Sequence, residues 1–409
     1  MERTTCLVVG GGPAGMVLGL LLARAGVAVT VLEKHADFLR DFRGDTVHPT
    51  TLDLLDELGL AEEFEKLPYN RFESAQLPTP QGMVQFADFS QLRGKHNYIA
   101  MVPQWDLLDL LADAAKREPS FTLRMETEAV DLVREHGRVV GVEYRTAAGE
   151  TGRILADLTV AADGRRSVLR RSAGMVVRDF PTPLDVWWFR LPRLADDPSG
   201  AVGVMSANRA VVMLDRNDYW QSAVLIRKGS DAENRARPVS EMIASIAAVA
   251  PWLSDRVGAV SSWDDVKLLD VRVDRMRRWY AEGLLCIGDA AHAMSPVGGV
   301  GINLAVQDAV AAARYLAAPL RARGVTTRHL ARVQRRRFLP TFVVQGMQRF
   351  LHARVLRPAL AGEIEIARAT DKLPLPVRMI RRFPWLRRVP AYLVGRGIRP
   401  EHAPDFARR

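Results

Sequence analysis

The hydrophobic pattern at the start of the chain predicts a strand, a tight turn, a helix and a second strand. Residues 4–9 form a short apolar run, and residues 14–25 place apolar side chains at helical spacing. Residues 28–32 form another short apolar run, and three consecutive glycines separate the first run from the helix. This order predicts a βαβ unit at the N-terminus.

The same segment contains an uncharged stretch, residues 5–23, whose length would also suit a membrane span or a secretory signal. Its middle holds Gly10, Gly11, Gly12 and Pro13. Each glycine costs a helix about 1 kcal/mol and a proline about 3 kcal/mol, so a spanning helix would break there. We therefore prefer the strand–turn–helix interpretation.

Periodicity in the rest of the chain predicts an α/β domain with a sheet-rich insertion. Helices are expected at residues 49–58, 105–117 and 301–316, strands at 158–162 and 284–287, and a hairpin at 121–145 that turns at His136-Gly137. Strand-like segments at 186–191, 210–214, 220–226 and 266–273 surround one helical stretch at 240–250. The expected domains are 1–175 with 275–340, an inserted 176–274, and a helical C-terminal region, 341–409.

Composition agrees with a globular protein of two or three domains. The chain has 409 residues, of which 48% are hydrophobic and 25% are charged. Its two cysteines, Cys6 and Cys286, lie in apolar runs and are too few for a disulfide framework, an iron–sulfur cluster or a structural zinc site. We expect no metal site, and a reducing cytoplasm fits this cysteine usage.

The net charge of +10 belongs to one end of the chain. Residues 335–409 contain 17 basic and 5 acidic side chains, whereas the rest of the chain has a net charge of −2. This distribution argues against nucleic-acid binding. Aromatic residues lie between the arginines of the tail, so it forms either a helical lid with a solvated basic face or a peripheral contact with an anionic membrane.

The glycine-rich turn carries the first chemical signal. Gly10, Gly12 and Gly15 fit the spacing GxGxxG, with Pro13 and Ala14 opening the helix. The first glycine allows the tight turn, the second lets a phosphate approach the backbone, and the third lets helix and strand pack closely. Glu33, followed by Lys34, ends the second strand, where a carboxylate accepts hydrogen bonds from a ribose. These features predict a Rossmann-type nucleotide-binding fold, with the nucleotide left open.

Two later segments resemble motifs of one enzyme family. Asp163-Gly164, with Ser167 and Arg170 following, resembles the Asp-Gly motif of the class A flavoprotein hydroxylases. Gly288-Asp289-Ala-Ala-His-Ala-Met-Ser-Pro296-Val-Gly-Gly299-Val-Gly301-Ile302-Asn303 resembles their Gly-Asp motif over its whole length. Together with the glycine turn, these motifs resemble the para-hydroxybenzoate hydroxylase-like, FAD-dependent monooxygenase family over about residues 1–340.

The resemblance implies a GR2-like Rossmann domain that binds FAD, and it assigns roles to individual residues. Asp289 would bind the ribityl chain, Arg43 the pyrophosphate, and Gln104 the flavin. Backbone amides near Gly301, Ile302 and Asn303 would face the pyrimidine edge of the isoalloxazine. Further cofactor contacts are expected at Glu33, Lys34, Val130, Asp163, Gly164, Gly288, Pro296 and Gly299.

The implied reaction uses NAD(P)H and O2. NAD(P)H would reduce FAD, oxygen would add as a C4a-hydroperoxide, and an aromatic, polyketide-like or unsaturated small molecule would be hydroxylated or epoxidised. Pro296 would line the substrate side of the flavin, and His48 is a second catalytic candidate. The alternatives are a flavin-dependent reductase or dehydrogenase of an isoprenoid or lipid-like substrate, and a flavin-holding protein without turnover.

The inserted domain is expected to cover the substrate. Its candidate lining residues are Trp187, Phe189 and Tyr219, which lie in aromatic strand segments. By strand alternation, Trp187 and Phe189 face one side of the sheet, whereas Trp188 and Arg190 face the other. Either face could be core or pocket at this stage.

Overall fold

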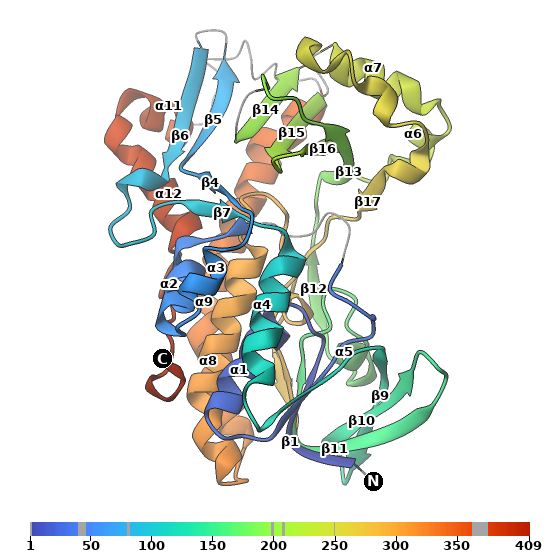
Figure 1. The fold of residues 1–409 in the computed structure, drawn as a ribbon, viewed down its shortest axis with the longest axis vertical. Coiled ribbons are helices and arrows are strands. Elements are labelled where there is room, and N and C mark those ends of the chain that lie inside the picture. The colour runs from blue at the N-terminus through green and yellow to red at the C-terminus, as the bar shows by residue number, and fades with distance from the viewer. Residues whose placement is uncertain are drawn as a thin grey trace.

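A parallel sheet at one end of the molecule carries the N-terminal βαβ unit (Figure 1). The computed structural model describes residues 2–39, 46–79, 82–197, 200–206, 209–248, 250–361 and 375–409. Within these ranges the parallel strands follow the order β8-β2-β1-β11-β20, and β19 closes the edge antiparallel to β20. The strands are β1 (Glu2–Val9), β2 (Val29–Leu32), β8 (Phe121–Arg124), β11 (Thr151–Ala161), β19 (Tyr280–Ala281) and β20 (Leu284–Cys286).

Three helices pack together against one face of this sheet: α1 (Pro13–Arg24), α4 (Gln104–Lys116) and α8 (Gly301–Arg321). Ten of the twelve residues of α1 are buried, because it lies between the sheet and the other two helices. A hairpin of β9 (Thr127–Glu135) and β10 (Arg138–Thr146) extends from β11. This is the predicted α/β core.

The structure corrects the predicted hairpin at residues 121–145. Residues 121–124 form β8, which pairs in parallel with β2 instead of joining the hairpin. The chain turns at Glu126, whose φ of 53° lies in the left-handed region, and the following strand β9 then pairs with β10. Periodicity alone could not separate the two strands, because both alternate in the same way.

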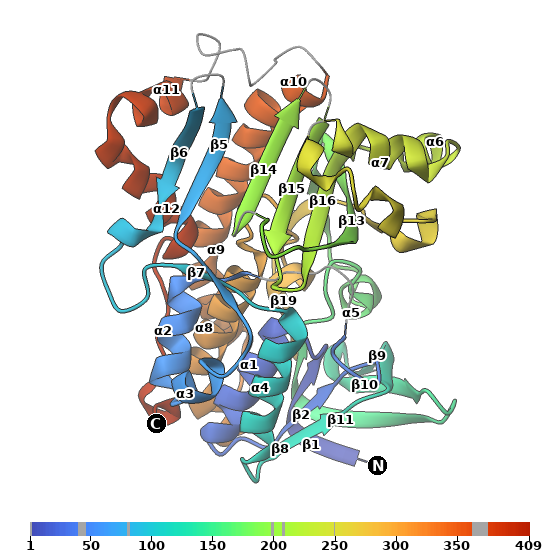
Figure 2. The same ribbon diagram turned by 45° about the horizontal axis from the view of Figure 1, so that its top comes forward.

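The inserted segment forms an antiparallel sheet at the opposite end of the molecule (Figure 2). Its described strands follow the order β14-β15-β16-β13-β17, with α6 (Asp231–Arg235) and α7 (Val239–Ala247) beside it. The strands are β13 (Leu184–Pro192), β14 (Ala201–Ser206), β15 (Arg209–Asp215), β16 (Tyr219–Arg227) and β17 (Lys267–Leu269). A short ladder of β12 (Val177–Phe180) and β18 (Val273–Met276) links this sheet to the parallel one.

A segment between the first two motifs adds strands that periodicity did not predict. After α2 (Pro49–Glu57) and α3 (Ala61–Phe64), β4 (Asn70–Phe72) pairs with β7 (Ile99–Met101), which also pairs with β3 (Thr46–Val47). β5 (Ser74–Thr79) and β6 (Gly82–Asp88) form a separate hairpin beside β14. The short β3-β7-β4 sheet therefore lies between the two larger sheets and is named the bridging sheet.

The C-terminal part begins with a long helix, α9 (Thr327–Leu351), which continues through the boundary predicted after residue 340. A π-helical turn (His352–Leu356), α10 (Arg357–Leu360), α11 (Leu375–Arg382) and α12 (Arg388–Gly395) follow. The last residues return to the parallel-sheet domain, where the amide of Arg409 donates to the carbonyl oxygen of Glu57. Among the described helices, none combines the length and apolar character needed to cross a bilayer.

Candidate active site

The three motif glycines meet different surroundings at the end of β1. A Cβ on Gly10 would lie 2.4 Å from the carbonyl oxygen of Ala162, and a Cβ on Gly15 would lie 1.9 Å from that of Gly10. Gly12 differs, because a Cβ there would meet no heavy atom within 4 Å. Gly10 and Gly15 are thus required by close packing, whereas Gly12 leaves open space against bare backbone, as a bound phosphate requires.

The start of α1 faces that open space. Gly12 is the N-cap, Pro13 opens the helix, and neither a capping side chain nor an acidic residue lies in the first turn. The first amides of the helix and its positive dipole end are therefore available to an anion. Ala14 is buried and borders Gly288, where an added Cβ would lie 3.3 Å from the Cβ of Ala14. The glycine turn and the Gly-Asp motif are therefore in contact.

Glu33 closes the same turn from β2. Its carboxylate accepts the amide of Gly11 at 2.9 Å and the amide of His35 at 3.1 Å, and the residue is 9% exposed. Its carbonyl oxygen accepts the amide of Thr127, which brings the start of β9 alongside. Val130 is half-buried on that strand, and Lys34 is exposed. These positions surround the place where the nucleoside of a bound dinucleotide would lie.

Asp163 and Gly164 follow β11 directly beside the glycine turn, since the amide of Ala162 donates to the carbonyl oxygen of Val9. Oδ2 of Asp163 accepts the amides of Val168 and Leu169 at 2.8 and 3.2 Å, while Oδ1 is buried with no hydrogen-bond partner. Burial raises the pKa of this carboxyl. A buried unpaired oxygen next to the nucleotide turn is a ready acceptor for a donor on a ligand.

The Gly-Asp motif is hydrogen-bonded to α8 through Gly288, and its Asp289 side chain is partly exposed. The amide of Gly288 donates to the buried Asp308 on α8 at 3.0 Å. Asp289 is about one-third exposed, and Nε of Arg165 lies 3.9 Å from its Oδ2. The backbone next to Asp289 is therefore held by Asp308 through Gly288, and the Asp289 carboxylate is left accessible to a ligand hydroxyl.

Pro296 and Gly299 form the turn that leads into α8. The amide of Gly299 donates to the carbonyl oxygen of Pro296 at 2.9 Å. Helix α8 begins at Gly301 with no capping side chain and no acidic residue in its first turn. The side chain of Asn303 accepts the hydroxyls of Thr50 and Thr51 at 2.7 and 2.9 Å, which fixes the helix start against α2. Its first amides are thus free to stabilise negative charge on a bound ring.

Residues on α9 that sequence reasoning missed support this turn. Gln348, which is fully buried, donates to the carbonyl oxygens of Ser295 and Val297, both at 2.9 Å. The hydroxyl of Ser295 lies 2.9 Å from Nε2 of His352, at the start of the π-helical turn. Burial lowers the pKa of His352. The signal for their role is the π-helical turn after α9, because such turns are frequent at functional sites. The sequence alone does not predict this turn.

Asp308 is a second missed residue. Its Oδ2 accepts Nε2 of His292 at 2.6 Å in addition to the Gly288 amide, and its Oδ1 accepts Nε of Arg337 at 3.0 Å. Burial alone would raise the pKa of Asp308, but the His292 and Arg337 interactions hold it below its ordinary value. His292 is 1% exposed and packs on Trp279, so it is a structural residue.

The structure contradicts a direct catalytic role for His48. The ring is fully buried, with Nδ1 2.8 Å from the carbonyl oxygen of Val394 and Nε2 3.0 Å from that of Gly299. Desolvation lowers its pKa to about 4. A ring that is fully buried between two backbone carbonyls is out of reach of a substrate, so His48 supports the turn at Gly299.

The structure also corrects two of the predicted substrate residues. Trp187 and Phe189 lie in the hydrophobic core with Met242 and Ile243 of α7. They are on the face of the antiparallel sheet that α7 covers, which is the outer face; the opposite face is the inner face. Tyr219 is half-buried and lies on the inner face. The guanidinium carbon of Arg190 lies 4.8 Å from the centre of its ring. Alternation was right about which residues share a face, but only the position of α7 decides which face is core.

The predicted pyrophosphate contact of Arg43 and flavin contact of Gln104 both stay predictions. Gln104 is the first residue of α4 and half-buried, next to the β7 strand of the bridging sheet. Arg43 lies outside the described residues. For Gln104, as for the other cofactor positions above, the contact with FAD stays a prediction.

The described residues fit FAD. The open space at Gly12, the unpaired Oδ1 of Asp163 and the accessible carboxylate of Asp289 lie just beyond the ends of the adjacent parallel strands β1, β11 and β20. The loop that contains Asp289 leads into the uncapped start of α8. Ligands of open α/β sheets bind at this edge. The space at Gly12 suits a diphosphate, the two carboxylates suit hydroxyl groups of the ligand, and the start of α8 suits an electron-poor ring.

Comparisons with known proteins agree with this fit. The family model described as FAD binding domain matches residues 3–346. The chain is 34% identical over 389 residues to 6-methylpretetramide 4-monooxygenase of Streptomyces rimosus, covering 93% of this chain and 92% of that protein. It is 28% identical over 317 residues to 3-demethoxyubiquinol 3-hydroxylase of Escherichia coli, covering 75% and 78%.

A solved structure shows the same fold. The OxyS anhydrotetracycline hydroxylase from Streptomyces rimosus matches with a TM-score of 0.74 at 22% identity, covering 96% of this chain and 76% of that one. The chain therefore belongs to the FAD binding domain family, with a Rossmann-type domain and a second, sheet-rich domain. It is an FAD-dependent monooxygenase, an oxidoreductase of the flavoprotein hydroxylase class.

Proposed function

We propose that this monooxygenase hydroxylates a polycyclic aromatic, polyketide-like molecule, using NAD(P)H and O2. The observation that carries the proposal is the mostly apolar inner face of the antiparallel sheet. Val186 and Ala223 are buried there, and Trp188, Val212 and Leu225 are partly buried, as are Leu356 and Leu360 from the C-terminal part. A long apolar face suits fused rings better than a small charged acid.

The bridging sheet brings this face towards the flavin-facing turn. The side chain of Asn70 on β4 donates to the carbonyl oxygen of Asp215, in the hairpin between β15 and β16. At the other edge of the bridging sheet, the hydroxyl of Thr46 donates to the carbonyl oxygen of Gly299 at 2.9 Å. Turn and hairpin are therefore tied to the same three strands, and a substrate between them would lie near the flavin ring.

Polar groups lie at one end of the inner face. Gln221 is 3% exposed, and its Oε1 accepts Nε of Arg216 at 2.9 Å. Tyr219 belongs to the same hairpin. Such groups can orient the oxygen substituents of a polyketide, since a few placed polar groups fix a ligand that apolar contacts hold.

When bound, FAD accepts a hydride from NAD(P)H and activates O2. The residues of this chain bind, orient and shield. The glycine turn and Asp289 hold the diphosphate and ribityl chain, and the first amides of α8 stabilise negative charge on the pyrimidine ring. Pro296 lines the substrate side without offering a group that exchanges protons, and the antiparallel sheet limits water access.

The test measures NAD(P)H oxidation by the FAD-loaded protein with a tetracyclic aromatic phenol, against a saturated polycycle of similar size. The proposal expects faster oxidation with the aromatic compound only, and a product carrying one oxygen atom from ¹⁸O2. A saturated product without oxygen consumption would instead indicate a reductase. NADPH oxidation that never responds to aromatic polycycles and yields only hydrogen peroxide would refute the substrate class.

We also propose that the enzyme is cytoplasmic and contacts an anionic membrane surface through its C-terminal region. Residues 375–400 contain seven arginines and no acidic residue. Large apolar side chains are exposed among them, including Phe383, Trp385, Val389 and Tyr392. Basic and aromatic side chains together favour an anionic lipid interface.

Sedimentation with vesicles tests the membrane proposal. The protein should pellet with phosphatidylglycerol vesicles at low salt and remain in solution with phosphatidylcholine vesicles. The double variant Trp385→Ser/Phe383→Ser should lose this binding while keeping its FAD. Equal recovery from both lipids would instead favour a lid over the substrate entrance.

A further inference from the structure

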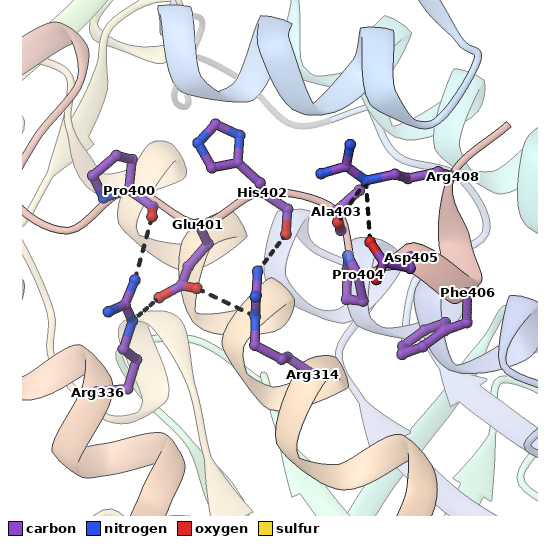
Figure 3. A pocket seen from close by; sticks show the side chains of 10 residues that line it. All are labelled: Arg314, Arg336, Pro400, Glu401, His402, Ala403, Pro404, Asp405, Phe406 and Arg408. Atoms are coloured by element: carbon purple, nitrogen blue, oxygen red, sulfur yellow. Dashed lines mark hydrogen bonds and ion pairs between the residues drawn. The ribbon is translucent and has the colours of Figure 1, made fainter.

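The last ten residues, 400–409, form a strap that crosses α8 and α9 (Figure 3). The amide of Glu401 donates to the side chain of Gln307 on α8, and Arg314 donates to the carbonyl oxygen of His402 at 2.7 Å. Farther along, the amide of Ala403 donates to Glu57. The strap therefore belongs to the FAD-binding domain, although it lies far from that domain in sequence.

Glu401 is the buried acid of this strap. Its side chain is 1% exposed and accepts Nε of Arg336, and Nε of Arg314 lies 3.6 Å away. Figure 3 shows the carboxylate between these two arginines, at the wall of a pocket of about 420 Å³. Nη1 of Arg337, which is 2% exposed, also lies 3.6 Å from Glu401. Three cations thus converge on one carboxylate.

Arg337 connects this carboxylate to the flavin motif. Its Nη1 faces Glu401, while its Nε donates to Oδ1 of Asp308 at 3.0 Å. The other oxygen of Asp308 receives the amide of Gly288 at 3.0 Å and Nε2 of His292 at 2.6 Å. The chain of contacts therefore runs without a gap from the C-terminal strap to the loop that presents Asp289.

Each link in this chain is buried, so solvent does not replace a lost partner. Asp308 and His292 are 0% and 1% exposed, and Arg337 is 2% exposed. Water therefore cannot pair with the Arg337 guanidinium if it loses Glu401. Neutralising Glu401 would leave the far end of Arg337 with the carbonyl oxygen of Arg399 at 3.3 Å. A buried guanidinium that loses a charged partner reorients, and Asp308 would lose its fixed position with it.

We propose that Glu401 is a positioning residue for FAD, acting through Arg337 on the Gly288–Asp289 loop. The strap thereby couples the C-terminus to cofactor binding. This inference rests on the FAD chemistry of the family and does not depend on the identity of the substrate.

The test compares the isosteric variant Glu401→Gln with the control Asp405→Asn in the full-length protein. Both remove one carboxylate from the same strap, but Asp405 is exposed and its closest cation is Arg408 at 3.8 Å. The Kd for FAD, measured by flavin fluorescence, should rise about tenfold for Glu401→Gln and change less than twofold for Asp405→Asn. The visible circular dichroism of bound flavin should change in the first variant only.

A double-mutant cycle separates positioning from general destabilisation. If Glu401 acts through Arg337, Glu401→Gln should raise the Kd little further in an Arg337→Gln background. An unchanged Kd for Glu401→Gln, or a fall in the unfolding temperature of the FAD-free protein with unchanged Kd and flavin spectrum, would overturn the proposal. If Arg337→Gln does not fold, the titration of Glu401→Gln against Asp405→Asn decides alone.

Discussion

Nε2 of His48 lies 3.0 Å from the carbonyl oxygen of Gly299, in the turn that precedes helix α8. The other ring nitrogen faces the carbonyl oxygen of Val394 on α12. One buried imidazole therefore joins the N-terminal domain, the Pro296–Gly299 turn and the C-terminal region. Its contribution is structural: desolvation keeps the buried ring neutral, so it donates to one of the two carbonyl oxygens and packs against the other.

This relationship predicts a loss of stability in mild acid. The pKa of His48 falls from 6.5 to about 4 in the folded protein, mainly through desolvation. Below pH 6.5 His48 is protonated in the unfolded chain but stays neutral in the folded chain until the pH approaches 4. The free energy of unfolding therefore decreases as the pH falls from 6.5 towards 4, and this contribution is constant above pH 7. Between pH 7.5 and 5 this contribution amounts to about 2 kcal/mol.

Urea unfolding at pH 7.5 and at pH 5 measures this contribution of His48 to stability, with the variant His48→Gln as the comparison. The variant should lack this part of the pH dependence, so that the difference in unfolding free energy between wild type and variant shrinks by about 2 kcal/mol at pH 5. An identical pH slope for both proteins would show that His48 is not the group responsible.

The motif glycines predict two separable defects. Gly12 has an ordinary φ of −75° and open space at its Cβ, and aspartate is a good helix N-cap. Gly12→Asp should therefore fold normally while its carboxylate repels the diphosphate, weakening FAD binding on the order of 100-fold. Gly15→Ala should instead lower stability by about 1–3 kcal/mol or more, because its Cβ would overlap Gly10.

FAD titration and thermal unfolding of the FAD-free proteins distinguish the two variants. A Gly12→Asp protein that retains FAD after gel filtration would contradict the assigned diphosphate site. A Gly15→Ala protein as stable as wild type would contradict the packing argument.

Asp289 is the predicted ribityl ligand. Its carboxylate is accessible and paired only loosely with Arg165, so Asp289→Ala should leave the fold intact. Loss of one charge-assisted hydrogen bond should weaken FAD binding by about 10- to 100-fold. The surface variant Asp264→Ala serves as control and should keep its full flavin absorbance. Full FAD content with normal turnover in Asp289→Ala would refute the assignment.

Neighbouring tryptophans on β13 should behave differently. Trp187 is 2% exposed in the outer core and donates to Asp231, so Trp187→Ala should cost about 3–5 kcal/mol of stability. Trp188 packs on the inner face with Leu356, so Trp188→Ala should mainly raise the substrate KM, by about tenfold.

Chemical unfolding and steady-state kinetics with an accepted aromatic substrate provide the two readouts. The reverse pattern, with Trp188→Ala the less stable protein and Trp187→Ala the one with altered KM, would place the substrate on the other face of the sheet.

Local sequence was enough for the nucleotide turn. Gly10, Gly12, Gly15 and Glu33 work within one βαβ unit, where spacing along the chain sets position in space. The Asp-Gly and Gly-Asp motifs were recognisable because each is a short segment whose backbone conformation is built from its own residues. The predicted fold class and FAD chemistry followed from these three segments.

Other features depended on contacts between distant segments. Alternation paired Trp187 with Phe189, but α7 decided that their face is core. Likewise, Asp308, Gln348 and Glu401 are ordinary polar residues in sequence, and they become part of the site because α8, α9 and the C-terminus fold against the motif loops.

The amino-acid order alone therefore specifies which backbone segments can bind a dinucleotide, since turn geometry and helix dipoles are local properties. Which side chains hold those segments in place, and which face of the sheet meets the substrate, are decided by tertiary packing. The reason is physical: burial and charge pairing depend on neighbours that lie from about twenty to about 250 residues away along the chain.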